Sequence, residues 1–546
     1  MRKEVKKTTI LAMAALVSAA VFGEHLSVDI QDGEGWYGGA TLFGSDVPYG
    51  LKAKSYKFDI RSNNYSNQAV PFLLSSKGRY VWSDKAFACT ITNGTIQLEG
   101  DAPIEVVSAG KTLKEAFLTA ARKHFPASGK LPDLALIEKP QWNTWVELTY
   151  NQNQKDILAY ARAIKENGFP SGGVLMIDDT WQFGYGIWQF DPRRFSNPKA
   201  MVDELHGMGW KVMLWVCPFV SMDSPGYREL ALGMLDSGRR TKAGGLLCGK
   251  PGDPKPVRWW NGKSANLDLT DPIGVNWFSR ELRRLQTEIG IDGFKLDAGD
   301  MDSYPEPYIT YKKATPSELC EAYAKIGLQF PLNEYRACFK QGGQPLVQRL
   351  CDKDHSWRAV QMLVPHMIHA GLLGYPFVCP DMIASGSWMA FAPDAPYPYE
   401  PEIFVRSAQV HALAPMMQFS AAPWRLLKGE MFKAVRDAAW LRMKFTPYIL
   451  RVAKASAKTG EPMLRSMEYE FPGHGWESVT DQFMMGSDLL VAPQIVKGAQ
   501  ERKVVIPPGT WVADDGVVVN GPTEISVKTP ISRLPYFVRQ GASFEE

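Results

Sequence analysis

A repeated alternation of short strands and helices runs through residues 131–472 and constrains the fold more than any other feature of the sequence. Gly173–Ile177 is a continuous apolar run, a helical pattern follows over 198–208, and another apolar run follows over 211–216. This alternation is typical of a parallel sheet covered by helices. The number and length of the repeats favour a (β/α)8 TIM barrel over an open sheet.

Polar or aromatic side chains stand at or near the ends of the predicted strands. Because the carboxyl ends of parallel barrel strands meet at one face, we expect these side chains to form an acidic, aromatic pocket. The strand over 291–296 ends in Asp297 and a tight turn through Gly299, a typical position for a catalytic carboxylate. The six residues are Trp145, Asp178, Trp215, Asp297, Arg336 and Asp381.

Residues 24–130 and 473–546 lack the alternation. The first segment is rich in Gly, Ser, Asn and Thr, with strand patterns at 55–60 and 78–82 and a helical pattern over 112–124. We interpret it as an N-terminal β-sandwich. The second segment has short strand patterns at 488–493, 503–507 and 511–512, separated by Gly and Pro turns, and predicts a C-terminal β-sandwich domain.

Residues 1–23 have the pattern of a secretory signal peptide. Four basic residues among the first seven precede an apolar stretch over 9–22, and small residues near its end suit a cleavage site. The stretch is short for a transmembrane helix, and no later stretch reaches the length of a membrane span. We therefore expect a secreted or periplasmic protein.

Composition and charge narrow the range of partners. The net charge is +3, and no basic stripe or zinc-finger spacing occurs, so no nucleic-acid partner is expected. The seven cysteines are odd in number and form no CxxC pair, so they predict neither a disulfide framework nor a zinc site, and most are interpreted as buried thiols. No cluster has metal-ligand spacing, so no metal or cofactor is expected. The 17 tryptophans suit stacking on sugars, although core packing accounts for most aromatic residues.

Four stretches of the chain carry a resemblance to glycoside hydrolase family 31, and the resemblance covers nearly the whole chain after residue 23. The four stretches are 293–300 (GFKLDAGD), 374–383 (GYPFVCPDMI), 402–424, and 486–493 with 508–511. Family 31 enzymes have an N-terminal β-sandwich, a (β/α)8 barrel and C-terminal β-domains. The resemblance therefore implies the same three parts over 24–130, 131–472 and 473–546.

Within the family, the KLDAG and PDMI motifs resemble most closely the branch that contains α-galactosidases and the animal myogenesis-regulating glycosidase. The Arg and His that α-glucosidases usually carry near 417–420 are absent. The resemblance thus implies a retaining, exo-acting α-glycosidase for terminal α-linked sugars, most similar to an α-galactosidase. The expected partner is an oligosaccharide or glycoside substrate.

Retaining glycosidases use two carboxyl groups about 5–5.5 Å apart, one as nucleophile and one as acid/base. By the resemblance, Asp297 is the nucleophile. Asp352 and Asp354 both stand where the acid/base is expected. The family spacing favours Asp352, which lies 29 residues before Asp381 and 16 after Arg336, with Asp354 in reserve. We expect Asp352 to hold a proton at rest, which requires nearby negative charge or burial.

We also expect a set of substrate-binding residues, among which the resemblance implies Asp178, Arg336 and Asp381. Lys295 shares a strand face with Asp297, and either stabilises its charge or forms a structural ion pair. Asp179 either contacts the sugar or serves as a helix cap or loop salt bridge. For each tryptophan, core packing is the alternative to a place in the pocket wall. The full set is Asp178, Asp179, Lys295, Arg336, Asp381, Trp145, Trp181 and Trp215.

Two other interpretations remain open. The same mechanism serves an α-glucosidase, an α-xylosidase or an α-N-acetylgalactosaminidase. An inactive carbohydrate-binding protein on the same fold is the alternative from another class. The sequence leaves linkage, aglycone preference and oligomeric state undetermined.

Overall fold

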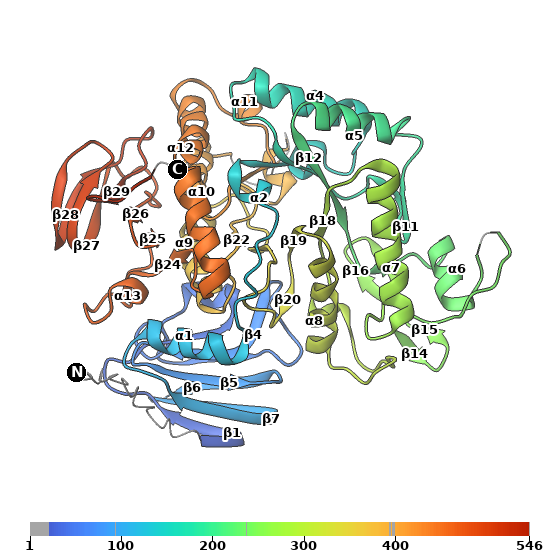
Figure 1. Cartoon of the computed structure of the whole chain (residues 1–546), viewed down its shortest axis with the longest axis horizontal. Coiled ribbons are helices and arrows are strands. Elements are labelled where there is room, and N and C mark those ends of the chain that lie inside the picture. The colour runs from blue at the N-terminus through green and yellow to red at the C-terminus, as the bar shows by residue number, and fades with distance from the viewer. Residues whose placement is uncertain (1–20, 93, 236, 393–394, 396–398, 545–546) are drawn as a thin grey trace, which may run out of the picture.

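The computed structural model describes residues 21–92, 94–235, 237–392, 395 and 399–544. It has the three predicted parts: an N-terminal sheet domain (blue), a central barrel, and a C-terminal sheet domain (red), as Figure 1 shows. The predicted signal peptide, 1–23, lies outside the described residues, except that 21–23 begin strand β1.

The N-terminal domain is an antiparallel sheet with the strand order β2-β4-β5-β7-β6-β3, and β1 lies beside β7. The long strand β7 pairs with β1, β5 and β6 and so connects the sheet. Helix α1 (Leu113–His124) begins with a capping box between Thr112 and Glu115 and packs on β4 and β5. The strands are β1 (Val21–Asp29), β2 (Trp36–Ala40), β3 (Tyr56–Asp59), β4 (Gln68–Ser75), β5 (Arg79–Ser83), β6 (Phe87–Thr92) and β7 (Thr95–Ser108).

The central domain is a parallel barrel whose strands follow one another in chain order around the ring. The ring closes where the backbone N–H of Ile383 donates to the carbonyl oxygen of Gln418 over 2.8 Å. The strands are β8 (Gln141–Asn143), β9 (Gly173–Ile177), β12 (Trp210–Val216), β18 (Gly293–Leu296), β19 (Leu332–Tyr335), β21 (Gln348–Arg349), β22 (Val378–Cys379) and β23 (Gln418–Phe419).

Helices surround the barrel, and their first turns carry the expected caps. Asn153, Asn197, Asp271, Thr315 and Ser356 each accept a hydrogen bond from a backbone N–H of the helix that follows. The longer helices are α4 (Gln154–Glu166), α5 (Pro198–Gly207), α6 (Pro225–Leu232), α7 (Pro272–Arg284), α8 (Pro316–Ile326), α9 (Trp357–Leu372), α10 (Pro401–Ala412) and α12 (Gly429–Thr459). The short ones are α2 (Ala135–Glu138), α3 (Trp145–Leu148) and α11 (Pro423–Leu426), whereas α13 (Met467–Glu470) packs on α1 and β25 outside the barrel.

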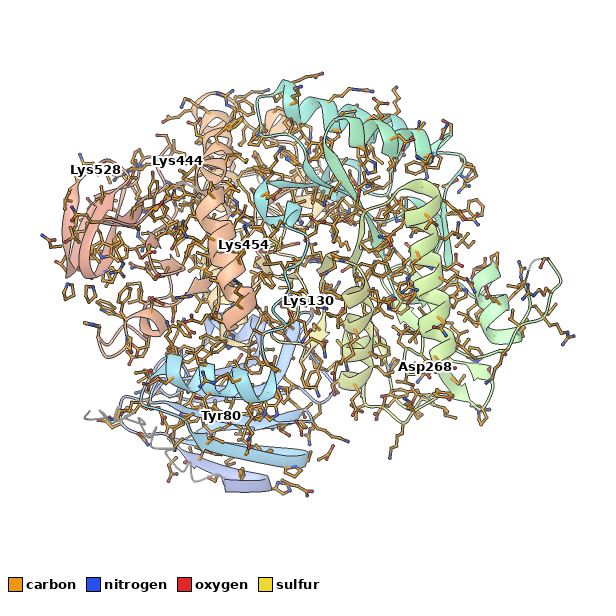
Figure 2. The ribbon with its side chains drawn as sticks, viewed as in Figure 1. Tyr80, Lys130, Asp268, Lys444, Lys454 and Lys528 are labelled. Carbon is orange, nitrogen blue, oxygen red and sulfur yellow. The ribbon has the colours of Figure 1, made fainter. Side chains whose placement is uncertain are left out.

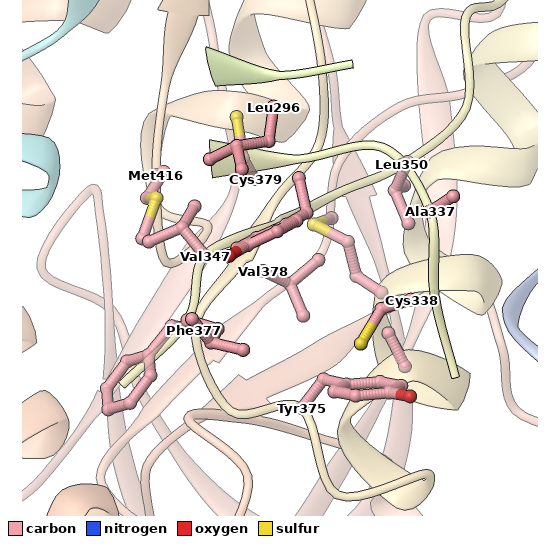
Figure 3. Packing of buried hydrophobic residues seen from close by; sticks show 14 of the residues in the cluster. Leu296, Ala337, Cys338, Val347, Leu350, Tyr375, Phe377, Val378, Cys379 and Met416 are labelled. Atoms are coloured by element: carbon pink, nitrogen blue, oxygen red, sulfur yellow. The ribbon is translucent and has the colours of Figure 1, made fainter. Parts of the chain in front are cut away.

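Apolar side chains fill the space around the barrel strands. Figure 3 shows this core beside β21 and β22, where Val347, Leu350 and Val378 lie with Tyr375 and Phe377. Each of these side chains is at most 2% exposed. Burial of a side chain of this size stabilises the fold by about 1.5–3 kcal/mol, so the short strands are held mainly by packing.

Small sheets lie in the loops that follow the carboxyl ends of the barrel strands. The hairpin β10 (Gln182–Gly184) and β11 (Ile187–Phe190) follows β9. Strands β13 (Phe219–Val220), β16 (Val257–Trp259) and β17 (Gly262–Asn266) form a second sheet after β12, and β14 (Cys248–Lys250) pairs with β15 (Asp253–Pro254). Strand β20 (Cys338–Phe339) pairs with β4 and thereby joins the barrel to the N-terminal sheet.

The C-terminal domain is a sheet with the order β24-β25-β26-β29-β27-β28. Figure 2 shows α12, marked by Lys444 and Lys454, between the barrel and this sheet, with Lys528 on the outer strand. The strands are β24 (Leu464–Arg465), β25 (Phe483–Met485), β26 (Leu489–Val491), β27 (Glu501–Ala513), β28 (Val518–Lys528) and β29 (Tyr536–Arg539).

One element prediction was wrong in detail. The separate strands expected at 503–507 and 511–512 belong to one strand, β27, because a register shift between Ile506 and Gly509 lets the chain continue through two prolines. The first barrel strand ends at Asn143, and Trp145 begins the short helix α3, so Trp145 does not lie on a strand.

Candidate active site

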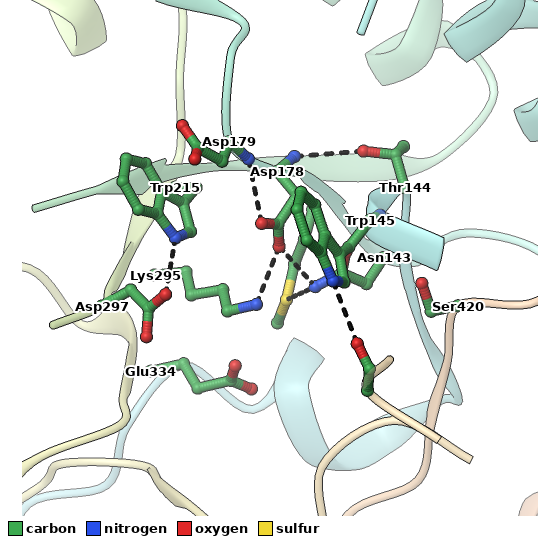
Figure 4. A network of polar contacts seen from close by, with 12 residues as sticks. Asn143, Thr144, Trp145, Asp178, Asp179, Trp215, Lys295, Asp297, Glu334 and Ser420 are labelled. Atoms are coloured by element: carbon green, nitrogen blue, oxygen red, sulfur yellow. Dashed lines mark hydrogen bonds and ion pairs between the residues drawn. The ribbon is translucent and has the colours of Figure 1, made fainter. Parts of the chain in front are cut away.

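The register of three adjacent barrel strands places the centre of the site. Trp215 on β12, Lys295 on β18 and Glu334 on β19 are direct partners across the sheet, so their side chains point to the same side. Figure 4 shows these side chains converging inside the barrel. Asp297 stands two residues after Lys295 and therefore continues the inward-facing row beyond the end of β18.

A tight turn after Asp297 fixes its position. Ala298 and Gly299 both have positive φ angles, 57° and 75°. A Cβ atom at Gly299 would lie 2.2 Å from Cδ1 of Tyr323, so only glycine fits there. The hydroxyl of Tyr323 donates to the backbone carbonyl of Asp297 over 2.9 Å, which ties the turn to α8.

Both carboxylate oxygens of Asp297 accept strong hydrogen bonds. Nη2 of Arg349 donates to Oδ1 over 2.9 Å, and Nε1 of Trp215 donates to Oδ2 over 2.9 Å. Burial alone would raise the pKa of Asp297, but the charges of Arg349, Arg336 and Lys295, with the Trp215 bond, hold this pKa well below its usual range. Asp297 is therefore ionised, as a nucleophile must be.

The two acid/base candidates lie in different surroundings. Asp352 lines the pocket, and its Oδ1 accepts from Nη1 of Arg349 over 2.8 Å. Both side chains are exposed, that of Asp352 to 53%, so burial does not hold a proton on Asp352. Asp354 lies outside the pocket lining and accepts a hydrogen bond from Ser356 at the start of α9. The geometry thus places Asp352 beside the nucleophile.

Arg349 is the central residue that sequence reasoning missed. It ends β21, is 1% exposed, and donates to Asp297, Asp352 and, at 3.3 Å, to Oδ1 of Asp381. A signal was available, since a basic residue stands within the short stretch 346–350 (LVQRL), three positions before Asp352. A buried arginine at a strand end is unusual unless carboxylates surround it.

Asp381 lies under the pocket with a strained backbone, φ 74°. Its side chain is 1% exposed, and Oδ2 has no hydrogen-bond partner among the described residues. Burial, together with the nearby Asp352, raises the pKa of Asp381 to about 6 against the lowering effect of Arg349. Asp381 therefore takes up a proton near neutral pH.

Asp178 forms a buried cluster with Lys295 and Asn143, visible in Figure 4. Nζ of Lys295 donates to Oδ2 of Asp178 over 2.7 Å, and Nδ2 of Asn143 donates to the same oxygen over 2.9 Å. Burial opposes the charge on Lys295, but Asp178 raises its pKa above the ordinary value. Lys295 thus fulfils both alternatives, since it is ion-paired and its charge also acts on Asp297.

Asp179 lines the pocket, but both of its oxygens are occupied. Donors come from Thr180, Gln182, the Tyr185 hydroxyl and, over 2.8 Å, Nδ2 of Asn261. Burial, with the charge of Asp178, raises the pKa of Asp179 to about 7. Asp179 therefore anchors the tip of the β16–β17 hairpin to the barrel, which matches the predicted loop contact more closely than a contact with sugar.

The predicted tryptophans separate into two groups. Trp145 and Trp215 line the pocket, and Nε1 of Trp145 donates to the carbonyl of Gly386 over 3.0 Å. Trp181 is completely buried, packs on Phe190 with ring centroids 4.7 Å apart, and does not line the pocket. The prediction that Trp181 contacts substrate was wrong, because the β10–β11 hairpin covers it.

The pocket has a volume of about 330 Å³. Sequence reasoning missed Trp260, which is half-exposed at the hairpin tip and lies over the Arg336 guanidinium at 5.1 Å. Arg336 also forms an ion pair with Asp300 over 3.1 Å. The lining consists of Trp145, Tyr150, Asp178, Asp179, Trp215, Trp260, Lys295, Asp297, Arg336, Arg349, Asp352 and Met382.

Three further properties hold for the described part of the chain. No group of three or more His, Cys, Asp or Glu residues there has the arrangement of a metal site. No described helix is long and apolar enough to cross a membrane. All seven cysteines are described and free, and five are buried: Cys89, Cys217, Cys320, Cys338 and Cys379.

A closed parallel barrel with two carboxylates on one guanidinium, in a pocket where its strands end, defines a site of the glycoside hydrolase class. Comparison with known families agrees with this class. The family 31 TIM-barrel domain matches residues 139–452, and the family 31 C-terminal domain matches 460–543. The chain belongs to glycosyl hydrolase family 31.

Several known proteins are similar to this chain. The myogenesis-regulating glycosidase of Mus musculus is 32% identical over 444 residues, which cover 79% of this chain and 59% of the mouse protein. The isomaltosyltransferase of Sporosarcina globispora is 27% identical over 64% of this chain and 34% of its own length. The chain thus spans between a third and three fifths of the length of these two relatives.

Among solved structures, a family 31 α-xylosidase from a soil metagenome, complexed with xylose, has a TM-score of 0.81. It is 22% identical and covers 95% of this chain, which spans 80% of that protein. At this identity the likeness shows that the two proteins share a fold.

Proposed function

We propose that this protein is a retaining, exo-acting α-glycosidase that hydrolyses terminal α-linked galactosides. One observation carries the proposal: Arg349 holds the ionised Asp297 and the pocket-lining Asp352 on the two ends of one guanidinium. This arrangement suits the short carboxyl separation, about 5–5.5 Å, that a retaining mechanism needs. The pocket lies at the small end of ligand sites, about 300–1,000 Å³, which favours a terminal sugar.

The mechanism follows from the positions of the two carboxyl groups. In the first step, Asp297 attacks the anomeric carbon, the glycosidic C–O bond breaks, and the leaving oxygen takes a proton from Asp352. In the second step, Asp352 takes a proton from water, the water oxygen attacks the anomeric carbon, and Asp297 leaves as a carboxylate. Two inversions restore the α configuration.

The choice of galactoside rests on the motifs of residues 293–300 and 374–383, which resemble the family branch that contains α-galactosidases. The buried Lys295–Asp178 pair would discriminate between sugar epimers, because a misplaced hydroxyl leaves a buried polar group unpaired. Similar proteins include an α-glucosidase and α-xylosidases, so an α-glucoside or α-xyloside is the second candidate. We also propose that the N-terminal segment directs export of the protein.

The test is hydrolysis of a panel of 4-nitrophenyl α-glycosides by the wild type and by three alanine variants, at Asp297, Asp352 and Asp354. We expect release from the α-galactoside, lost in Asp297→Ala, strongly reduced in Asp352→Ala and retained in the matched control Asp354→Ala. Hydrolysis of a different α-glycoside with the same pattern would keep the mechanism and replace the sugar. Full activity in Asp297→Ala would exclude this mechanism.

When azide is added, the anomeric configuration of the glycosyl azide product distinguishes the roles of the two carboxyl groups. Asp297→Ala should yield the β-glycosyl azide, because azide replaces the nucleophile and inverts once. Asp352→Ala should yield the α-glycosyl azide, because azide attacks the glycosyl-enzyme. Binding of sugar without hydrolysis by the wild type would favour a carbohydrate-binding protein.

A further inference from the structure

Arg349 touches both groups that exchange charge in the proposed reaction. Nη2 donates to Oδ1 of Asp297 at 2.9 Å, and Nη1 donates to Oδ1 of Asp352 at 2.8 Å. The guanidinium is 1% exposed and the Asp297 side chain 11%, whereas the Asp352 side chain is 53% exposed and reached by solvent. Nε of Arg349 has no hydrogen-bond partner among the described residues, so the two terminal nitrogens make all its ionic contacts.

The first step of the proposed mechanism moves one negative charge without changing the total. Before it, Asp297 is a carboxylate and Asp352 carries a proton. After it, Asp297 is a neutral ester and Asp352 is a carboxylate, because its proton has left on the departing sugar or alcohol. The charge therefore passes from the Nη2 end of Arg349 to the Nη1 end, and the second step returns it.

Resting on that proposed function, we propose that Arg349 is a positioning residue that couples the two carboxyl groups, keeping one cation beside the negative charge in both half-reactions. A planar guanidinium spans two carboxylates at once, whereas a lysine ammonium is a point charge. The contact with Asp352 stabilises its carboxylate form as it develops. In the glycosyl-enzyme, the same contact orients the carboxylate that must accept a proton from water.

Other charged groups act on the same guanidinium and are part of its setting. Asp381, after β22, accepts from Nη1 at 3.3 Å and shares this end with Asp352. Asp381 is itself partly protonated near pH 6, because burial is the main cause that raises its pKa to about 6. Further charged groups around Arg349, Asp381 and Asp297 include Glu334 on β19, Lys295 on β18, Arg336 after β19, Asp300 after β18 and Lys353 after β21.

The test uses the full chain with Arg349→Gln, Arg349→Lys and the control Arg162→Gln, an exposed arginine on α4 paired with Glu204. The pH dependence of kcat/KM reports the essential acid and base of the free enzyme. In Arg349→Gln, loss of the positive charge should move both the acidic and the basic limb of the kcat/KM pH profile to higher pH. It should also lower kcat/KM by about 10²–10³-fold. Arg349→Lys should keep both limbs near the wild-type positions with a smaller loss, and the control should match the wild type.

Thermal unfolding shows whether Arg349→Gln is folded, and a second measurement serves if it is not. Glycosides with a basic phenyl leaving group depend on proton donation more than the 4-nitrophenyl glycosides do. Arg349→Lys should therefore lose more rate on the phenyl substrate, whereas a purely structural role would slow both equally. Equal losses, or a folded Arg349→Gln with unmoved limbs, would overturn the inference. A wild type without Asp297-dependent hydrolysis would instead overturn the proposed function, and the inference with it.

Discussion

Nζ of Lys295 and Oδ2 of Asp178 lie 2.7 Å apart and join two barrel strands that are not neighbours. Strand β12 lies between β18 and β9, so this ion pair spans the inside of the barrel below the pocket. Both side chains are at most 4% exposed. A pair in this position braces the floor of the site and fixes the Asp178 carboxylate.

Removal of Lys295 should strongly destabilise the protein. Lys295→Met leaves Asp178 charged and buried, and we expect the free energy of unfolding to fall by about 3–5 kcal/mol. Denaturant unfolding at constant pH measures this change. The double variant Lys295→Met with Asp178→Asn removes the stranded charge and should recover a large part of the loss. No recovery would show that the pair does not act through its charges.

Glu334 should make stability depend on pH. Oε2 accepts a hydrogen bond from Gln418 over 2.8 Å, Oε1 has no partner among the described residues, and burial raises the pKa of Glu334 to about 7. Between about pH 4.5 and 7 the unfolded chain loses this proton while the folded protein keeps it. Stability therefore falls as the pH rises through this range, by on the order of 3 kcal/mol for this group.

The variant Glu334→Gln cannot titrate, so its unfolding free energy should fall less between pH 5 and 8 than that of the wild type. Unfolding curves over this range measure the two slopes. Parallel slopes would show that Glu334 does not hold a proton in the folded protein.

Trp215 should set the position of the acidic limb in the pH profile of kcat. Its Nε1 hydrogen bond to Asp297 favours the ionised nucleophile, and hydrogen bonds to charged groups contribute about 1.5–3 kcal/mol. Trp215→Phe should therefore lower kcat by roughly 10- to 100-fold and move the acidic limb to higher pH. Phe169→Leu, behind the barrel wall, provides a core control that should leave the limb in place.

Trp260 should act on substrate binding more than on chemistry. It is 48% exposed at the hairpin tip, where neighbouring Asn261 is tied to Asp179. Trp260→Ala removes a ring that stacks with about 0.5–1.5 kcal/mol, so KM should rise roughly 2- to 10-fold with little change in kcat. Trp440→Ala, on a similarly exposed tryptophan of α12 outside the pocket lining, should leave KM unchanged. A drop confined to kcat would contradict the assignment.

The sequence alone determined the alternation that makes the barrel, because the apolar periods of strands such as Gly173–Ile177 and of the capped helices between them are local features. Besides the reserve Asp354, it indicated ten site residues, and the structure places eight of them around one pocket but leaves Asp381 and Trp181 out of its lining. The eight are Trp145, Asp178, Asp179, Trp215, Lys295, Asp297, Arg336 and Asp352. The reason is that parallel strands bring their carboxyl ends to the same face, so position in a repeat predicts position in space.

Only the tertiary structure decided which side chains reach one another across the ring. Arg349 looked like an ordinary residue at the end of a short strand, and its three carboxylate contacts come from segments after β18, β21 and β22. Trp181 and Asp179 stand beside Asp178 in the chain, yet a hairpin covers the first, and the donors Tyr185 and Asn261 occupy the second. Burial and hydrogen-bond partners of this kind depend on residues distant in sequence, which local patterns do not encode.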